Sequence, residues 1–101
     1  MIKAVFRIHG DSASFSISGH SGSNESGKDI VCAAVSSAAY MTANTITEIL
    51  KVNACVSVDN GYMQLSFEKS EAAADIVKGL ELHLRELSGQ YPQFVKVTTE
   101  V

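Results

Sequence analysis

Cys32 and His20 are the two residues of this sequence whose types and spacing could together perform nucleophilic chemistry. Cys32 lies near the predicted start of an alanine-rich helix, where unpaired N–H groups and the positive end of the helix dipole favour an anion. A thiolate is such an anion and is the reactive form of cysteine, so this placement favours a nucleophile. The alternative is a small apolar cysteine that only fills space in a core.

His20 comes twelve positions before Cys32, in a segment (19–28) that has no aliphatic side chain. A histidine there could take the proton of Cys32 as a general base and later return it to a leaving amine. The alternative is a solvent-exposed loop histidine. We expect the segment to be mobile, because it offers nothing to bury in a core. Its glycines fit neither of the nucleotide-binding signatures.

Asp29, just before Cys32, has two competing roles. Its side chain could cap the helix by accepting a backbone N–H of Val31 or Cys32. It could instead orient the imidazole of His20 as the third member of a triad. Capping is favoured, because local geometry supplies it without any further rearrangement.

Ser36 lies one helical turn after Cys32 on the same face, and it too has two possible roles. Its hydroxyl could meet a bound substrate, or it could donate to the carbonyl of Cys32 within the helix. The remaining candidates are weaker. We expect Cys55, in a predicted strand, to be inert, and His9 and His83 to be incidental.

Hydrophobic periodicity places these residues in a pattern of five strands and two helices. Alternating segments predict strands over 2–9, 13–18, 55–59, 62–67 and 95–101, with a hairpin turn at Asn60-Gly61. Helices are predicted over 29–50 and from Ser70, as N-cap, to the closing Gly89 and Pro92. The expected buried stripes are Val31, Ala34, Val35, Ala38, Met41, Thr45 and Ile49 on the first helix, and Ala73, Ile76, Val77, Leu80, Leu84 and Leu87 on the second.

The element order is ββαββαβ, which predicts an α+β two-layer sandwich with two helices packed on one sheet. The 101 residues are enough for a single domain, 1–101. A net charge of −3 without any cluster of Lys or Arg argues against direct nucleic-acid binding. No apolar stretch long enough for a membrane span is expected, and no secretory signal, so we expect a cytoplasmic protein with reduced thiols. Two cysteines and scattered histidines predict neither a metal site nor a cofactor.

Gly19-His20-Ser21 and the later run from Gly27 to Ser36, which contains Asp-Ile-Val-Cys-Ala-Ala-Val-Ser, resemble the ribosomal-processing cysteine proteases of bacteria. The family has a Gly-His pair, a short flexible loop and that eight-residue run. Ser21 stands where alanine is more usual in the family. The length and the order of elements fit the family over the whole chain.

The resemblance implies an enzyme that removes a short N-terminal extension from large-subunit ribosomal protein twenty-seven, after a stretch rich in phenylalanine. It implies Cys32 as nucleophile and His20 as base, with Gly19 and Ser36 near the substrate, and it implies a homodimer. Two other functions remain open. One is a non-enzymatic ribosome-associated interaction module; the other is a redox sensor at Cys32, which lacks a nearby resolving thiol.

Overall fold

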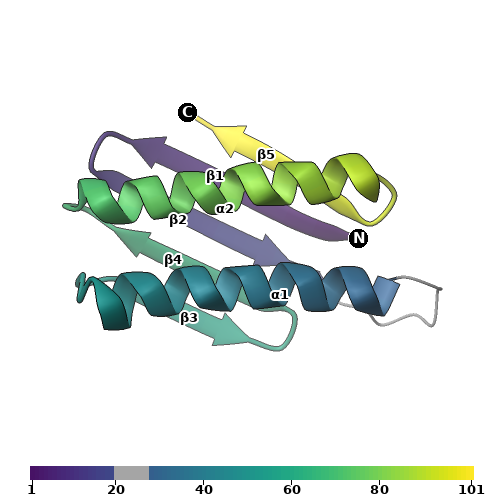
Figure 1. Ribbon diagram of the computed structural model, residues 1–101, viewed down its shortest axis with the longest axis horizontal. Coiled ribbons are helices and arrows are strands. Elements are labelled where there is room, and N and C mark those ends of the chain that lie inside the picture. Colours follow the sequence, from purple (N-terminus) through teal and green to yellow (C-terminus); the bar gives the residue numbers. More distant parts are fainter. Residues whose placement is uncertain (20–27) are drawn as a thin grey trace.

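The computed structural model describes residues 1–19 and 28–101 of the chain. They form one five-stranded sheet with two long helices on one of its faces (Figure 1). The elements are β1 (Ile2–His9), β2 (Ser12–Ser18), α1 (Lys28–Asn44), the π-helical turn η1 (Thr45–Ile49), β3 (Cys55–Asp59), β4 (Tyr62–Phe67), α2 (Glu71–Gln90) and β5 (Val95–Glu100). The predicted α+β sandwich and its order ββαββαβ are confirmed.

The sheet is antiparallel except at one edge. Its strand order is β3-β4-β2-β1-β5; β5 runs parallel to β1, and the other neighbours run antiparallel. The predicted Asn60-Gly61 turn joins β3 to β4, with Asp59 paired opposite Tyr62. Because β3 is an edge strand, one row of its backbone groups has no partner in the sheet.

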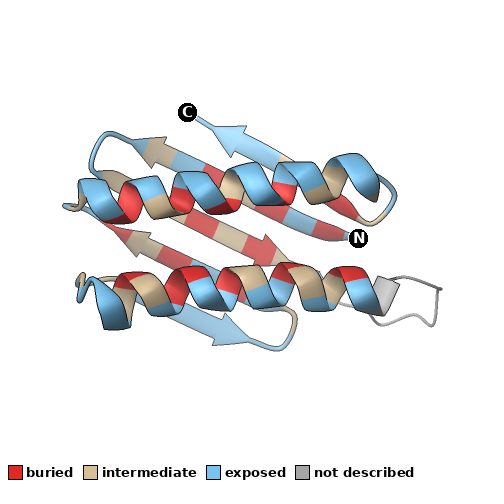
Figure 2. Ribbon diagram, viewed as in Figure 1, coloured by how far each residue is buried: buried red, intermediate tan, exposed pale blue. Residues whose placement is uncertain are grey.

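Period-two alternation decides which face of the sheet is buried. In β1, Ala4 and Phe6 point toward the helices and are buried, whereas Lys3 and Arg7 are exposed on the other face. The rings of Phe6 and Phe15 pack 6.0 Å apart, measured between their centroids. Figure 2 shows the same division, with buried positions alternating along the strands and lining the helices. The core therefore lies between the sheet and the two helices.

The buried stripe of α1 differs from the predicted one. Val31 and Val35 are buried as expected, but Met41 and Ile49 are 73% and 75% exposed. The buried positions are Val31, Val35, Ala39, Thr42, Ala43 and, in η1, Ile46. The prediction failed because alanines occur on several sides of this helix, so the pattern of small apolar residues does not define a single face.

The helix also ends differently from the prediction, in a π-helical turn. The N–H of Leu50 donates to the carbonyl of Thr45 over 2.9 Å, five residues earlier, which shifts the helical register near Ile49. Threonine hydroxyls in this region donate to backbone carbonyls one turn earlier, from Thr42 to Ala38 and from Thr45 to Met41. These bonds give carbonyls near the irregular turn an additional donor.

The segment Ile30–Ile49 is long and apolar enough to cross a membrane by length and composition, which corrects the expectation that no segment is. A third of the tested window is buried inside the protein. The buried side of the segment packs on the sheet as one half of the helical layer. This packing accounts for the apolar residues on the buried side of the segment.

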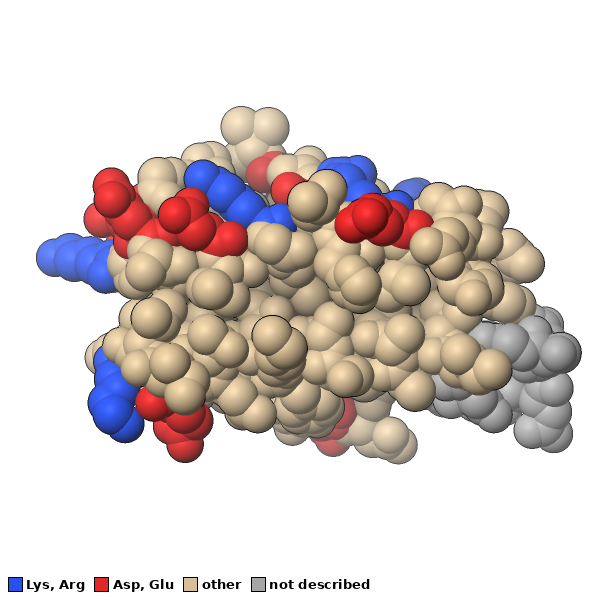
Figure 3. Space-filling model, viewed as in Figure 1, with Lys and Arg blue, Asp and Glu red and all other residues tan. Residues whose placement is uncertain are grey.

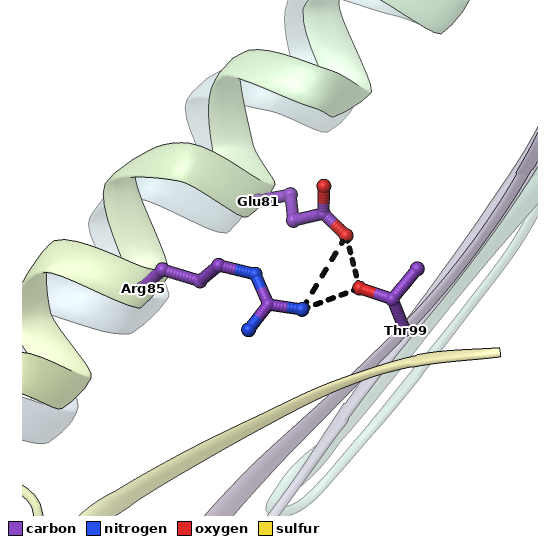
Figure 4. A network of polar contacts seen from close by, with 3 residues as sticks. All are labelled: Glu81, Arg85 and Thr99. Atoms are coloured by element: carbon purple, nitrogen blue, oxygen red, sulfur yellow. Dashed lines mark hydrogen bonds and ion pairs between the residues drawn. The ribbon is translucent and has the colours of Figure 1, made fainter.

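The second helix follows the prediction closely. The Ser70 hydroxyl accepts the N–H of Ala73 over 3.0 Å as the N-cap, and the whole predicted stripe is buried or half-buried against the core. The helix runs through the predicted stop at Gly89 to Gln90. Polar contacts join it to β5: the Thr99 hydroxyl donates to Glu81 and accepts from Arg85 over 2.5 Å (Figure 4).

Candidate active site

Cys32 lies in the second described turn of α1, because the helix already includes Lys28. The sequence placed Cys32 two residues, or about half a turn, closer to the helix start. The Cα–Cβ bonds of a helix tilt toward its N-terminus, so a side chain at this position still leans over the first turn. Cys32 is half-buried and packs against the core. The fold therefore holds the residue in place while leaving part of it open to solvent.

A hollow of about 180 Å³ opens beside Cys32 where four parts of the fold meet. These parts are the start of β1, the end of β2, the turn between β3 and β4, and α1. Its lining residues are Ile2, Ile17, Gly19, Cys32, Val35, Ser36 and Gly61. Of these, Ile2, Ile17 and Val35 are buried and form an apolar floor. Three residues predicted from the sequence, Gly19, Cys32 and Ser36, thus line one hollow.

Gly19 is fixed at the rim of this hollow by its backbone. Its φ of +103° lies in a region that side chains disfavour, and a Cβ built there would lie 2.3 Å from the carbonyl oxygen of Met1. Its N–H donates to the carbonyl of Gly61 over 3.0 Å, which ties the end of β2 to the β3–β4 turn. Only glycine can adopt this φ and also avoid the Met1 carbonyl oxygen, so Gly19 shapes the hollow through its lack of a side chain.

Ser36 is exposed and lines the hollow one turn after Cys32. Among the hydrogen bonds of the described residues, none joins its hydroxyl to the Cys32 carbonyl, whereas Thr42 and Thr45 do bond carbonyls one turn earlier. Its hydroxyl is therefore available to a molecule bound in the hollow. The contact of Ser36 with a substrate stays a prediction.

Two predicted site residues are not placed by the structure. His20 lies outside the described residues, and so does the side chain of Asp29, whose backbone belongs to α1. The helix begins before Asp29, so this residue follows the start of the helix instead of preceding it as a strict N-cap would. A carboxylate near a helix N-terminus is favoured by the dipole in either case. The base role of His20 and both roles of Asp29 stay predictions.

Cys55 lies far from this site. It is exposed at the start of β3 and lines a different, larger hollow with Lys51 and Asn53, which follow the end of the first helix. The stretch of α1 from Cys32 to Asn44 alone spans roughly 18 Å at 1.5 Å per residue. The Cα atoms of a disulfide lie about 4.4–6.8 Å apart, so Cys55 is not a resolving thiol for Cys32 within one chain.

The described residues, 1–19 and 28–101, hold no group of three His, Cys, Asp or Glu side chains that could bind a metal ion.

The hollow beside Cys32 continues along α1 toward Tyr40, Asp59 and Tyr62, and these three residues were not predicted from the sequence to belong to the site. Only the Asn60-Gly61 turn signal pointed to that region. Nothing in the sequence showed that this turn would lie beside the helix that carries the thiol.

The fold and the hollow together define a class: a two-layer α+β domain in which a half-buried cysteine in the second turn of a helix lines an open hollow. The comparison with known proteins names the family. Residues 1–96 match the family model described as "Cysteine protease Prp", so the chain belongs to the Prp family of ribosomal-processing cysteine proteases.

Relatives cover almost the whole chain. The ribosomal processing cysteine protease Prp of Bacillus subtilis (strain 168) is 26% identical over 111 residues, which cover 100% of this chain and 99% of the relative. The crystal structure of SMU.848 from Streptococcus mutans is 29% identical, with a TM-score of 0.85 over 98% of this chain and 93% of that one. Prp from S. aureus, solved in complex with a substrate peptide, shares the fold at 19% identity and a TM-score of 0.89, over 99% of this chain and 100% of that one.

Proposed function

We propose that this protein removes a short N-terminal extension from large-subunit ribosomal protein twenty-seven, with Cys32 as its nucleophile. Membership of the Prp family supports a ribosomal-processing protease. The observation that carries the proposal is the hollow at which Cys32 lies together with Gly19 and Ser36. Its apolar floor suits a substrate whose cleavage site follows a stretch rich in phenylalanine.

The proposed reaction proceeds through an acyl-enzyme. His20 takes the proton of the Cys32 thiol, and the thiolate sulfur attacks the carbonyl carbon of the scissile peptide bond. The resulting oxyanion is stabilised by backbone N–H groups at the start of α1, where the helix dipole is positive. The imidazolium then protonates the leaving nitrogen, the C–N bond breaks and a thioester remains. Water deprotonated by His20 hydrolyses the thioester and restores the thiol.

Ser36 and Gly19 hold the substrate in this proposal. The exposed Ser36 hydroxyl lies one turn from the thiol and can donate to or accept from the peptide backbone. Gly19 presents bare backbone at the rim, so an extended chain can approach closely. The role of His20 rests on the sequence alone.

In this proposal the protein acts in the cytoplasm as a homodimer, without direct contact to nucleic acid or membrane.

The direct test is cleavage of a synthetic peptide with the sequence of the host's extension, followed by mass spectrometry. Two fragments that meet at the phenylalanine-rich stretch are the expected result for the wild type and for Cys55→Ala, whereas Cys32→Ala leaves the peptide intact. Binding of the peptide without cleavage by the wild type would instead support a ribosome-associated interaction module. Equal cleavage by Cys32→Ala would show that another group is the nucleophile.

A further inference from the structure

The outer side of α1 differs from that of α2. Residues 30–47 contain no Asp, Glu, Lys or Arg, although Ile30 and Met41 are 71% and 73% exposed. The exposed side of a helix in a globular protein usually carries charged residues, as α2 does at Asp75 and Lys78. Figure 3 shows charged side chains over α2 and at the left end of the molecule, with a largely uncharged surface along α1. An uncharged exposed surface of this length indicates contact with another molecule.

A continuous groove runs beside this helix from the thiol. The hollow at Cys32 shares Ser36 and Gly61 with a second hollow, which in turn shares Tyr40 and Met63 with a third, of about 390 Å³. The path from Cys32 to Asn44, which lines the third hollow, covers roughly 18 Å at 1.5 Å per residue. An extended chain advances about 3.3 Å per residue, so the groove has room for roughly five or six residues.

The far end of the groove, which we call the distal subsite, is built from α1, β3 and β4. Its floor is apolar and buried at Ala43 and Met63. Its walls are Tyr40, Val56 and Val58, which are 48%, 43% and 51% exposed. β3 is an edge strand, so its backbone also offers unpaired groups along the wall. This combination suits an extended polypeptide with an apolar side chain directed at the floor.

The charges of the groove select among such polypeptides. Among the described residues that line the three hollows, the only charged ones are Glu48 and Asp59, and both are exposed. One carboxylate oxygen of Asp59 accepts the N–H of Asn60 over 2.7 Å, which leaves its other oxygen available. Two carboxylates without a lining cation favour a ligand with basic side chains and disfavour an acidic one.

We infer that the distal subsite binds a second part of the substrate polypeptide, remote from the cleavage point, that is extended, apolar and carries a basic side chain. The inference rests on the proposed function, because it takes the groove at Cys32 as the place of cleavage. It goes further by assigning Tyr40, Val58 and Glu48 to substrate selection. The enzyme then recognises a length of chain as well as the residues at the cut.

The test compares two peptides from the N-terminal segment of the host's ribosomal protein twenty-seven. The short peptide covers only the residues at the cut. The long one extends it by about six residues in both directions, so that one of the two extensions fills the groove, which admits about that length on one side of the thiol. The wild type is expected to cleave the long peptide with at least a roughly tenfold higher kcat/KM, carried mostly by KM, since remote contacts act on binding. Two further long peptides carry either Lys or Glu about five residues from the cut, and the peptide with Glu is expected to lose most of this gain.

Variants locate the effect. Val58→Lys is expected to raise KM for the long peptide roughly tenfold and to leave the short peptide unchanged, since loss of one apolar contact at an interface commonly costs about that factor. Glu48→Lys is expected to reverse the preference, favouring the peptide with Glu over the one with basic residues. Leu82→Lys is the matched control, because Leu82 is 64% exposed on α2 and away from the groove. Leu82→Lys is expected to leave the KM for both peptides unchanged.

The outcomes separate the two proposals. If the wild type cleaves neither peptide, the proposed function itself fails. If it cleaves both with equal kcat/KM, or if Val58→Lys affects both equally, the protease stands and the distal subsite is wrong. Light scattering supplies the remaining check: a change from dimer to monomer in Val58→Lys would mean that the face joins two copies of the chain, which also overturns the inference.

Discussion

Replacement of Gly19 by alanine tests how the rim of the hollow is built. The new Cβ would lie 2.3 Å from the Met1 carbonyl oxygen and 3.1 Å from the Ile2 Cα, both backbone atoms that cannot rotate away. A φ of +103° adds a conformational cost of about 1–3 kcal/mol for a residue with a side chain. Overpacking typically costs about 1–3 kcal/mol more. We expect the free energy of unfolding to fall by about 3 kcal/mol.

Thermal unfolding followed by circular dichroism measures this change. For a domain of this size, 1 kcal/mol shifts Tm by about 4–8 °C, so Gly19→Ala is expected to melt at least about 10 °C below the wild type. Gly79→Ala is the matched control. Gly79 lies inside α2, and apart from the adjacent residues and backbone of its own helix no heavy atom lies within 4 Å of a built Cβ, so alanine there is expected to stabilise by about 0.5–1 kcal/mol. The same substitution should therefore change Tm in opposite directions at the two sites.

Two results would refute this reasoning. A Tm of Gly19→Ala within about 2 °C of the wild type would show that the backbone near Met1 adapts freely. A comparable loss of stability in Gly79→Ala would show that alanine is harmful for reasons unrelated to close approach. Cleavage by Gly19→Ala, measured well below its Tm, then reports separately on the shape of the hollow.

Three further variants test the roles assigned above. His20→Ala is expected to lower kcat by roughly 10²–10⁴-fold with little change in peptide affinity; activity within a few-fold of the wild type would assign the base elsewhere. Ser70→Ala removes the N-cap hydrogen bond to the Ala73 N–H and is expected to lower the free energy of unfolding, measured by chemical denaturation, by about 1 kcal/mol; an unchanged denaturation midpoint would show that this bond does not stabilise the protein. Thr99→Val breaks an exposed network and is expected to change the free energy of unfolding by less than about 1 kcal/mol; a larger loss would make that network structural.

The sequence predicted the fold well because most of its signals are local. Alternation in β1 and β2, the Asn60-Gly61 turn and the Ser70 cap each define an element without reference to the rest of the chain. It failed at the face of α1, where the real stripe runs through Ala39 and Ala43. Alanine packs against a sheet or faces solvent with little difference in energy, so only the tertiary contacts decide. The π-helical turn at Thr45–Ile49 had no recognisable signal either.

The site was predictable to the extent that it is contiguous in sequence. Cys32 and Ser36 lie one turn apart on a single helix, and their neighbourhood follows from helical geometry. The groove beyond them does not, because Tyr40 lines hollows together with Asp59 and Val58 only through the order of strands in the sheet. Pairing between distant segments is set by the fold as a whole, which local patterns do not encode.

The central claim is that Cys32 is the nucleophile, and covalent labelling with a substrate-like electrophile tests it most directly. A peptide chloromethyl ketone with phenylalanine next to the reactive carbon is incubated with the wild type, and the labelled residue is found by peptide mapping. Cys55, which is the more exposed thiol, serves as the internal control. The account predicts a single addition at Cys32 that abolishes cleavage, at a rate that drops when substrate peptide is present. Labelling at Cys55 alone, or full activity after stoichiometric labelling of Cys32, would contradict it.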